Sequence, residues 1–230
     1  MEYIHLDLGD QQSIRHFADV IQKRGLEIDC LINNAGVMWL NKHNTKQHVE
    51  MHFGVNYLGH FLLTILLLPH MKQNSRILML GSITSLFGKI PFDDINLNKN
   101  YNKFEAYANS KLAICHFAQS LAKRLEKSGK NISVFYVNPG SATTEITKTL
   151  PYILQFLYKT VGRIIFKTPF QGACCSIYAA ISDELDGKNG LFLYECRPQE
   201  NVARSLPIYN EEREMLWQLS EKLTSSQYPF

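Results

Sequence analysis

The stretches that decide the fold are RILMLGS at residues 76–82, FEAYANSKLAICHFAQSLAKRLEK at residues 104–127 and ISVFYV at residues 132–137. The first and third are short apolar runs, typical of strands that are buried on both faces of a sheet. The second has apolar residues at helical spacing, and Gly129 follows it as a stop signal. Two buried strands joined by a long helix predict a parallel sheet.

The same alternation continues on both sides of this unit. We expect strands at 3–8, 29–32 and 190–194, and helices at 11–24, 48–71, 171–181 and 211–223. The first helix should end at Gly25, which has the position of a C-terminal cap. No internal repeat, low-complexity tract or linker divides the chain. The pattern predicts an α/β protein with a doubly wound parallel sheet and a single domain over residues 1–230.

The composition is that of an ordinary globular protein. Of 230 residues, 45% are hydrophobic and 20% are charged, and the formal net charge is only +3. Because no dense run of lysines and arginines is present, we expect no nucleic-acid partner. Five cysteines without a C-x-x-C pattern indicate neither a disulfide framework nor a zinc site. A reducing, intracellular compartment fits this pattern.

Neither a signal peptide, a membrane span nor a metal site is predicted. Residues 1–7 lack the basic and apolar regions of a signal peptide. The longest apolar stretch, 61–69, is far shorter than the ~20 residues that a span needs. His48 and His52 stand four residues apart but lack the glutamate of the H-E-x-x-H motif, so we interpret them as ordinary helix surface.

Tyr107 and Lys111 stand four residues apart on the predicted helix, so both side chains can point in one direction. A nearby ammonium ion favours the phenolate and lowers a tyrosine pKa from its ordinary value of about 10. Tyr107 could then exchange a proton with a substrate oxygen while a hydride moves at the carbon. Ser82 follows a predicted strand, at the edge where open parallel sheets bind ligands, and its hydroxyl could orient the same oxygen.

Each of these residues also has an ordinary interpretation. Taken singly, Tyr107 and Lys111 are common helix residues, and Ser82 is a cap at a strand end. Asp7 serves equally well as a turn or helix-entry residue. Asn56 lies in an apolar helix, where a polar side chain is costly unless it is hydrogen-bonded. The ordered set nevertheless favours a carbonyl-reducing site.

Several short motifs point to one family. They are Asn33-Asn34-Ala35-Gly36, Val55-Asn56-Tyr57-Leu58-Gly59, Leu80-Gly81-Ser82, Tyr107 with Lys111, and Pro139-Gly140 followed by Thr144. With them, the chain resembles the short-chain dehydrogenase/reductase family from residue 3 to the C-terminus. Residues 52–64, 167–169, 194–196 and 216–217 are most similar to the retinol-dehydrogenase-like group. The resemblance implies a Rossmann-like fold and an oxidoreductase that transfers hydride between NADP or NAD and a small lipophilic alcohol or carbonyl compound, retinoid- or steroid-like.

The resemblance also implies a role for each matching residue. Ser82 would bind the substrate carbonyl, Tyr107 would be the general acid/base, and Lys111 would bind the nicotinamide ribose and lower the tyrosine's pKa. Asn56 would distort its helix locally and hold a water that relays protons to Lys111. The implied cofactor-binding residues are Asp7 beside the adenine, Asn33, Asn34, Ala35 and Gly36 along the adenosine ribose, Tyr107 and Lys111, and Pro139, Gly140 and Thr144 on the nicotinamide side.

The chain departs from the family pattern at its start. Family members open with a strand, a T-G-x-x-x-G-x-G turn, a helix and a second strand, and we expect this chain to begin after all of them. With the strand order 3-2-1-4-5-6, two absent strands would leave a gap of about 14 Å beside the strand at 3–8. The strand at 29–32 should then expose an apolar edge that aggregates or pairs with another chain.

Loss of that turn should impair the enzyme. Its backbone amides normally bind the cofactor pyrophosphate, so we expect affinity to fall by several orders of magnitude and the isolated chain to have negligible activity. The alternative is a catalytically inactive fragment that acts as an interaction or dominant-negative partner. Such a chain would pair with other subunits, or as a homodimer, through the helix at 104–127. A third possibility is an inert fragment that is rapidly degraded.

Residues 150–167 are apolar and aromatic, with three interspersed basic residues, Lys159, Arg163 and Lys167. They could form core, a lid over a lipophilic substrate, or a surface that touches a membrane. We favour the lid, with peripheral membrane contact as its second role. The expected location is therefore the cytoplasm or the surface of the endoplasmic reticulum.

Overall fold

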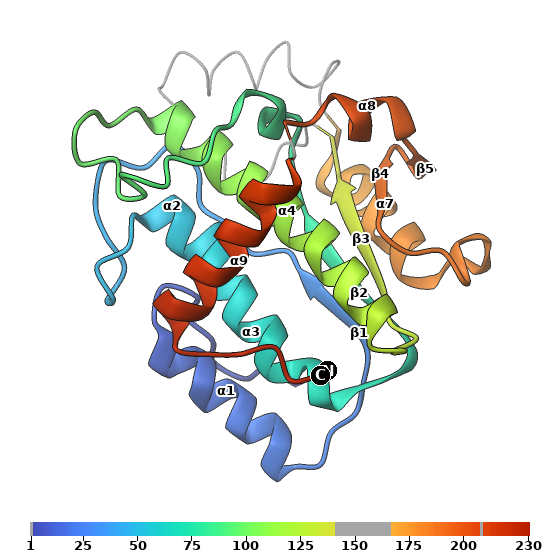
Figure 1. The fold of residues 1–230 in the computed structure, drawn as a ribbon. Helices are drawn as coiled ribbons and strands as arrows, with labels where there is room; N and C mark the ends of the chain where they lie inside the picture. Colours follow the sequence, from blue (N-terminus) through green and yellow to red (C-terminus); the bar gives the residue numbers. More distant parts are fainter. Residues whose placement is uncertain (1, 141–166, 208) are drawn as a thin grey trace.

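The computed structural model describes residues 2–140, 167–207 and 209–230 (Figure 1). Its helices and strands, with η marking short 3-10 or π segments, are α1 (Gln11–Lys23), β1 (Ile28–Asn33), α2 (Met51–Phe53), η1 (Gly54–Gly59), α3 (His60–Leu67), η2 (Leu68–His70), β2 (Met71–Leu80), η3 (Ile83–Phe87), α4 (Lys103–Lys127), β3 (Ser133–Asn138), α7 (Pro169–Ile181), η5 (Asp183–Leu185), β4 (Leu191–Tyr194), β5 (Arg197–Pro198), α8 (Glu200–Ser205) and α9 (Asn210–Thr224). Outside residues 3–8, the predicted strands and helices of the described ranges are present close to their expected places.

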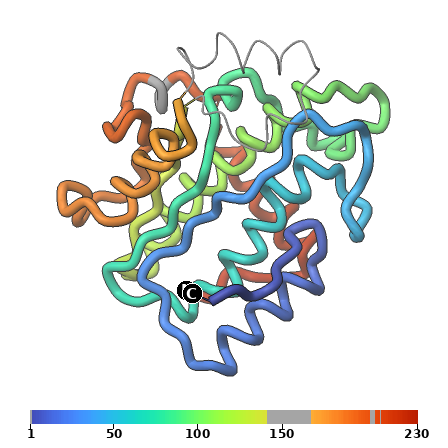
Figure 2. Tube along the Cα trace, turned by 180° about the vertical axis from the view of Figure 1, so that it is seen from behind, coloured from blue at the N-terminus to red at the C-terminus, as the bar shows by residue number. Residues whose placement is uncertain are grey.

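The strands form one sheet in the order β1-β2-β3-β4-β5. β1 to β4 run parallel, as predicted, and β5 pairs antiparallel with β4. Alternate residues of β2 face opposite layers: Ile77 and Met79 pack under α3, α4 and α9, whereas Leu78 and Leu80 pack against α7. Helices therefore cover both faces of the sheet (Figures 1 and 2). This is the α/β, Rossmann-like doubly wound arrangement that the sequence predicts.

Residues 3–8 are not a strand, so that prediction is wrong. A strand needs a neighbour for its main-chain N–H and C=O groups, and this segment lies beside helices instead. Ile4, Leu6 and Leu8 pack into an apolar cluster between α1 and α3. The alternating apolar residues of 3–8 therefore mark one buried side of an extended segment, and this segment is not a strand of the sheet. The predicted gap between strands does not arise, and β1 is the edge strand.

The edge at β1 is open. Ile32 is 46% exposed, and the neighbouring Cys30 and Leu31 are only partly buried. Figure 2, which views the molecule from behind, shows α7 over the strands farther from this edge and β1 beyond it. The exposed apolar edge is therefore confirmed, while aggregation or pairing through it stays a prediction.

α9 covers the outer side of α3 and α4 (Figure 1). The Trp217 ring packs against Phe61 and Phe117, with ring centres 5.3 and 5.7 Å apart. Tyr57 and Ser220 share a buried hydrogen bond across the same contact. The chain's own α9 thus covers part of α4, the helix through which we expect pairing with another subunit. That pairing stays a prediction.

The helical stretch Met51–His70 is 20 residues long, with a mean hydropathy of 1.5 in its most apolar window. Length and composition alone would let it cross a membrane. However, 89% of that window is buried inside the protein, as expected for the central helix of a folded core. Its apolar character is therefore explained by packing between α1, α4, α9 and the sheet.

Candidate active site

Three strand ends bring the predicted site residues to one edge of the sheet. Asn33 of β1 pairs with Met79 of β2, and Leu80 of β2 pairs with Val137 of β3. Because the strands are parallel and end together, the segments that follow them leave the sheet at the same edge. Those segments are residues 34–36, 81–82 and 139–140.

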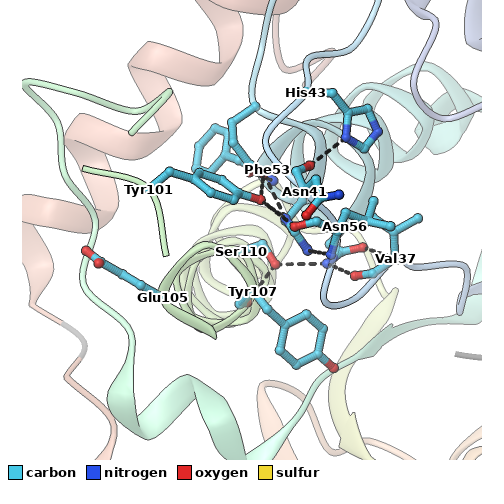
Figure 3. Close-up of polar contacts among 12 residues, drawn as sticks. Val37, Asn41, His43, Phe53, Asn56, Tyr101, Glu105, Tyr107 and Ser110 are labelled. Carbon is cyan, nitrogen blue, oxygen red and sulfur yellow. Dashed lines mark hydrogen bonds and ion pairs between the residues drawn. The ribbon is translucent and has the colours of Figure 1, made fainter. Parts of the chain in front are cut away.

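Tyr107 and Lys111 share a face of α4. The helix begins where the Asn102 side chain accepts hydrogen bonds from the N–H groups of Phe104 and Glu105. Lys111 Nζ lies 5.7 Å from the centre of the Tyr107 ring, and both side chains are buried. Figure 3 shows the Tyr107 ring projecting from the helix, with its hydroxyl at the far end. The structure therefore brings the two groups together, as the four-residue spacing predicts.

The Lys111 amine connects α4 to the end of β2. Its Nζ donates a hydrogen bond to the Leu80 carbonyl at 2.9 Å, two residues before Ser82. Burial lowers the pKa of Lys111 to about 8, because the protein interior solvates the charge less well than water does. The amine is therefore mostly protonated at pH 7. The hydrogen bond to Leu80 uses one of the three N–H groups of the Lys111 amine, and the other two can donate to a ligand.

Asn56 lies in η1, a π-helical segment within the long helical stretch. The local helix distortion that the resemblance implies is therefore present. Asn56 Oδ1 accepts a hydrogen bond from the Val37 N–H at 2.7 Å, and Nδ2 donates to the Val37 carbonyl and to Ser110 Oγ, both at 2.9 Å (Figure 3). These bonds offset the cost of burying a polar side chain. The part of Asn56 in a proton relay stays a prediction.

Gly36 brings the segment after β1 close to Asn56 and Lys111. A Cβ atom at this position would lie 3.1 Å from Asn56 Oδ1 and 3.8 Å from Lys111 Nζ. The preceding residues, Asn34 and Ala35, are exposed at the sheet edge. The absence of a side chain at Gly36 thus keeps space beside the amine and the amide, where a cofactor ribose could approach.

His60 of α3 holds the same segment from inside the protein. Its Nε2 donates to the Ala35 carbonyl at 2.8 Å, and its Nδ1 lies 3.1 Å from the side chain of Asn33. Burial lowers the pKa of His60 to about 4, so the ring is neutral at pH 7. Sequence reasoning missed this residue, because a histidine in an apolar helix carries no signal of the chain segment that it will meet.

Ser82 follows β2 and is half-buried. Its Oγ accepts a hydrogen bond from the Thr84 N–H at 3.2 Å, which caps η3. The capping role that we weighed for Ser82 is therefore present. This bond uses a lone pair of the oxygen and leaves the hydroxyl hydrogen to be donated to a substrate oxygen. Capping and substrate binding are thus compatible in one side chain.

His52 and Glu50 form a buried pair beside Tyr107, so the prediction that His52 lies on the helix surface is wrong. His52 Nδ1 donates to Glu50 Oε1 at 2.7 Å, and Nε2 accepts from the Leu40 N–H at 3.3 Å. Burial alone raises the pKa of Glu50, but hydrogen bonds from His52 and the Phe53 N–H outweigh it and hold this pKa below its ordinary value. The His52 ring meets the Tyr107 ring edge-on, with centres 6.4 Å apart.

Asp7, Pro139 and Gly140 are the remaining predicted cofactor residues that the structure describes. Asp7 is exposed, and its carboxylate accepts a hydrogen bond at 2.8 Å from the N–H two residues later, which is a turn contact. Its adenine-binding role stays a prediction. Pro139 and Gly140 follow β3, and Gly140 has a φ of 78°, a conformation that favours glycine. Thr144 and the proposed lid at 150–166 lie outside the described residues.

Comparison with known sequences places the chain among dehydrogenases. The family model described as "short chain dehydrogenase" matches residues 1–152. The chain is 36% identical over 232 residues to human polyprenol dehydrogenase, covering 97% of this chain and 69% of the relative. It is 38% identical over 220 residues to human retinol dehydrogenase 14, covering 94% of this chain and 64% of the relative. The chain thus spans about two thirds of the length of these relatives.

Solved structures show the same architecture. An uncharacterized protein from Mycobacterium paratuberculosis superposes with a TM-score of 0.78 at 30% identity, over 100% of this chain and 77% of that one. A short chain dehydrogenase from Burkholderia cenocepacia in complex with NADP superposes with a TM-score of 0.59 at 21% identity, over 83% of this chain and 73% of that one. The second likeness supports the fold alone.

Proposed function

Since this chain belongs to the short-chain dehydrogenase family, a family of NAD(P)-dependent oxidoreductases, we propose that Tyr107, Lys111, Ser82 and Asn56 form a site for hydride transfer. The reaction transfers a hydride between NADP(H) or NAD(H) and a lipophilic alcohol or carbonyl compound. The observation that carries the proposal is the placement of the Lys111 amine 5.7 Å from the centre of the Tyr107 ring and 2.9 Å from the carbonyl of Leu80, two residues before Ser82.

The chemistry of each residue follows from this placement. In the reductive direction, the Ser82 hydroxyl donates a hydrogen bond to the substrate carbonyl oxygen and holds it toward Tyr107. The Tyr107 hydroxyl gives its proton to that oxygen as the carbonyl carbon gains a hydride, which the bound cofactor supplies. The positive charge on Lys111 stabilises the tyrosinate that remains. In the oxidative direction, the tyrosinate takes the proton back.

The residues fit a nicotinamide cofactor at this edge of the sheet. Lys111 has N–H groups beyond the one bound to Leu80, and Gly36 leaves the space beside them free of a side chain. Open parallel sheets bind ligands at the ends of their strands, which is where these residues lie.

Long-chain isoprenoid or retinoid alcohols and aldehydes are the proposed substrates. The support is the similarity to proteins named polyprenol dehydrogenase and retinol dehydrogenase. Contact with a membrane surface through 150–167 stays part of the same proposal, because such substrates partition into lipid.

A second candidate function is a non-enzymatic interaction partner. The open edge of β1, with its exposed Ile32, favours it, because unpaired strand edges readily pair with other chains. In that case loss of a single phenolic oxygen at Tyr107 would leave every property of the chain unchanged.

The test is product formation from retinaldehyde and from a short polyprenal, with millimolar NADPH or NADH. We expect slow alcohol formation by the unmodified chain and about a 10²- to 10⁴-fold lower rate for Tyr107→Phe, since a positioned general acid contributes about that much. Tyr57→Phe is the matched control, because its hydroxyl is buried against α9, and it should retain the full rate. Equal rates for Tyr107→Phe and the unmodified chain would reject the proposal.

A further inference from the structure

Tyr136 of β3 has a buried hydroxyl that the proposed reaction does not use. Its side chain is 1% exposed, and its ring stacks on Phe192 with centres 4.9 Å apart. The hydroxyl oxygen accepts a hydrogen bond from the Ser82 N–H at 3.1 Å and can donate to the Ser82 carbonyl at 3.2 Å or to the Lys111 carbonyl at 3.4 Å. One phenol thus contacts the main chain of two proposed site residues.

The Tyr136 hydroxyl lies where the hydrogen-bond ladder between β2 and β3 ends. The Gly81 N–H donates to the Val137 carbonyl at 2.8 Å, and at Ser82 the chain turns into η3. The N–H and C=O groups of Ser82 have no strand residue opposite them at that point. The Ser82 carbonyl also accepts hydrogen bonds from the Ser85 N–H at 3.1 Å and from Ser85 Oγ at 2.7 Å. The Tyr136 hydroxyl is therefore needed chiefly by the Ser82 N–H, from which it accepts.

The Tyr136 ring and Gly81 are complementary in shape. A Cβ atom at Gly81 would come within 2.0 Å of the ring carbon Cζ and 2.3 Å of the hydroxyl oxygen. Real atoms do not approach so closely, so the ring can reach Ser82 only because residue 81 has no side chain. The contact joins residues 54 positions apart in the sequence.

Tyr136 is not suited to carry protons itself. Burial raises the pKa of Tyr136 well above its ordinary value, so the phenol stays protonated at physiological pH. The effect of the residue must therefore come from holding its neighbours in place.

We propose that Tyr136 is a positioning residue that holds Ser82, through its main chain, against α4 and thereby sets where the Ser82 hydroxyl meets the substrate oxygen. The inference rests on the proposed function, since the place of that hydroxyl matters only if it binds substrate. Gly81 is required for the same contact, because its lack of a side chain leaves the space that the Tyr136 ring occupies.

Tyr136→Phe tests this with the loss of one oxygen, and Tyr57→Phe is its matched control. Both tyrosines are 1% exposed and hydrogen-bonded, so both variants should lose similar stability. We expect Tyr136→Phe alone to lower kcat roughly ten- to a hundredfold with little change in the KM for cofactor, the size of a small misplacement of a reacting group. We also expect exchange of the Ser82 amide hydrogen to become about tenfold faster.

A second pair of variants tests the role of Gly81. Gly81→Ala should lower kcat and the melting temperature, because the new Cβ displaces the Tyr136 ring. Adding Tyr136→Phe to Gly81→Ala should lower kcat no further, because the displaced ring can no longer bond to Ser82. A further loss of kcat in the double variant would contradict the proposal that the two residues act together.

The outcomes separate this inference from the proposed function. If Ser82→Ala and Tyr107→Phe lower the rate while Tyr136→Phe matches Tyr57→Phe in kcat and in Ser82 exchange, Tyr136 is not a positioning residue. If Ser82→Ala leaves the rate unchanged, the proposed function of Ser82 fails instead. The exchange measurement needs neither substrate nor cofactor, and unchanged exchange in Tyr136→Phe overturns the inference by itself.

Discussion

The surroundings of Asn56 and Lys111 differ sharply from the edge of the sheet at β1, although the two regions are joined by residues 34–37. Around Asn56 and Lys111, the polar atoms are buried and bonded to defined partners in α4, η1 and the ends of β1 and β2. At β1, an apolar side chain, Ile32, is 46% exposed, and one side of the strand has no neighbouring strand in the described part of the chain.

The difference follows from what covers each region. α4 and η1 cross the strand ends of the first region, and the side chains there bond across the contact, which favours a single arrangement. Among the described residues, no strand lies beyond β1, so its outer edge can pair with another chain. The residues proposed for catalysis thus lie where their contacts favour a single arrangement, whereas the exposed edge of β1 can pair with another chain.

Removing Asn56 should have the largest effect on stability. Asn56→Leu keeps the size of the side chain but leaves the N–H and C=O of Val37 without their partner, which should cost about 3 kcal/mol of the free energy of unfolding. Urea unfolding measures this loss. The exposed Asn100 offers a control, and Asn100→Leu should change the free energy by less than about 0.5 kcal/mol. Equal changes in the free energy of unfolding of the two variants would show that the buried hydrogen bonds of Asn56 add no stability.

Removing the charge of Lys111 should stabilise the chain. The pKa of Lys111 is lowered from 10.5 to about 8, so burying the protonated amine costs about 3 kcal/mol at pH 7. The charge-assisted hydrogen bond to Leu80 offsets about 1.5 to 3 kcal/mol of this cost, so Lys111→Met should be up to about 1.5 kcal/mol more stable.

The sign of the pH dependence follows from the lowered pKa. Below pH 8 the folded and unfolded chains both carry the proton, so the full cost is present. Between pH 8 and 10.5 the folded chain releases its proton first, and the stability of the unmodified chain should rise toward that of Lys111→Met. Chemical unfolding at pH 7 and pH 10 checks this. A stability difference that does not shrink with pH would contradict it.

A change at the open edge should have the smallest effect on stability. Ile32→Lys places a charge on an exposed strand residue, and we expect the free energy of unfolding to change by less than about 0.5 kcal/mol. Self-association, measured by light scattering, should fall, because a lysine at an edge opposes strand pairing.

The control for the edge is Ile181→Lys on α7, where the isoleucine is 72% exposed. If this variant reduces self-association as much as Ile32→Lys does, exposed apolar surface in general, and not the edge of β1, drives association.

Much of the fold was predictable from sequence. β1, β2, β3 and β4 are apolar runs between glycine, asparagine and proline residues, and α4 has both helical spacing and the stop signal at Gly129. Residues 3–8 show why such reasoning fails. Alternating apolar residues report one buried side, but they do not say whether a sheet or a pair of helices covers it.

The site was only partly predictable. Spacing predicted the meeting of Tyr107 and Lys111, because residues four apart on a helix are neighbours. No local pattern predicts that His52 turns inward to Glu50 and Tyr107, or that Tyr136 fits the space at Gly81. These contacts join distant residues and depend on shape, which a linear sequence does not display.

The most direct test of the central claim is whether Tyr107 and Lys111 act as one unit in hydride transfer. Rates of retinaldehyde reduction at millimolar NADPH would be measured for Tyr107→Phe, Lys111→Met and the double variant. The account predicts that the double variant is no slower than the slower single variant, because a unit that has lost one member gains nothing from the other. Losses that multiply in the double variant, or single variants as fast as the unmodified chain, would contradict it.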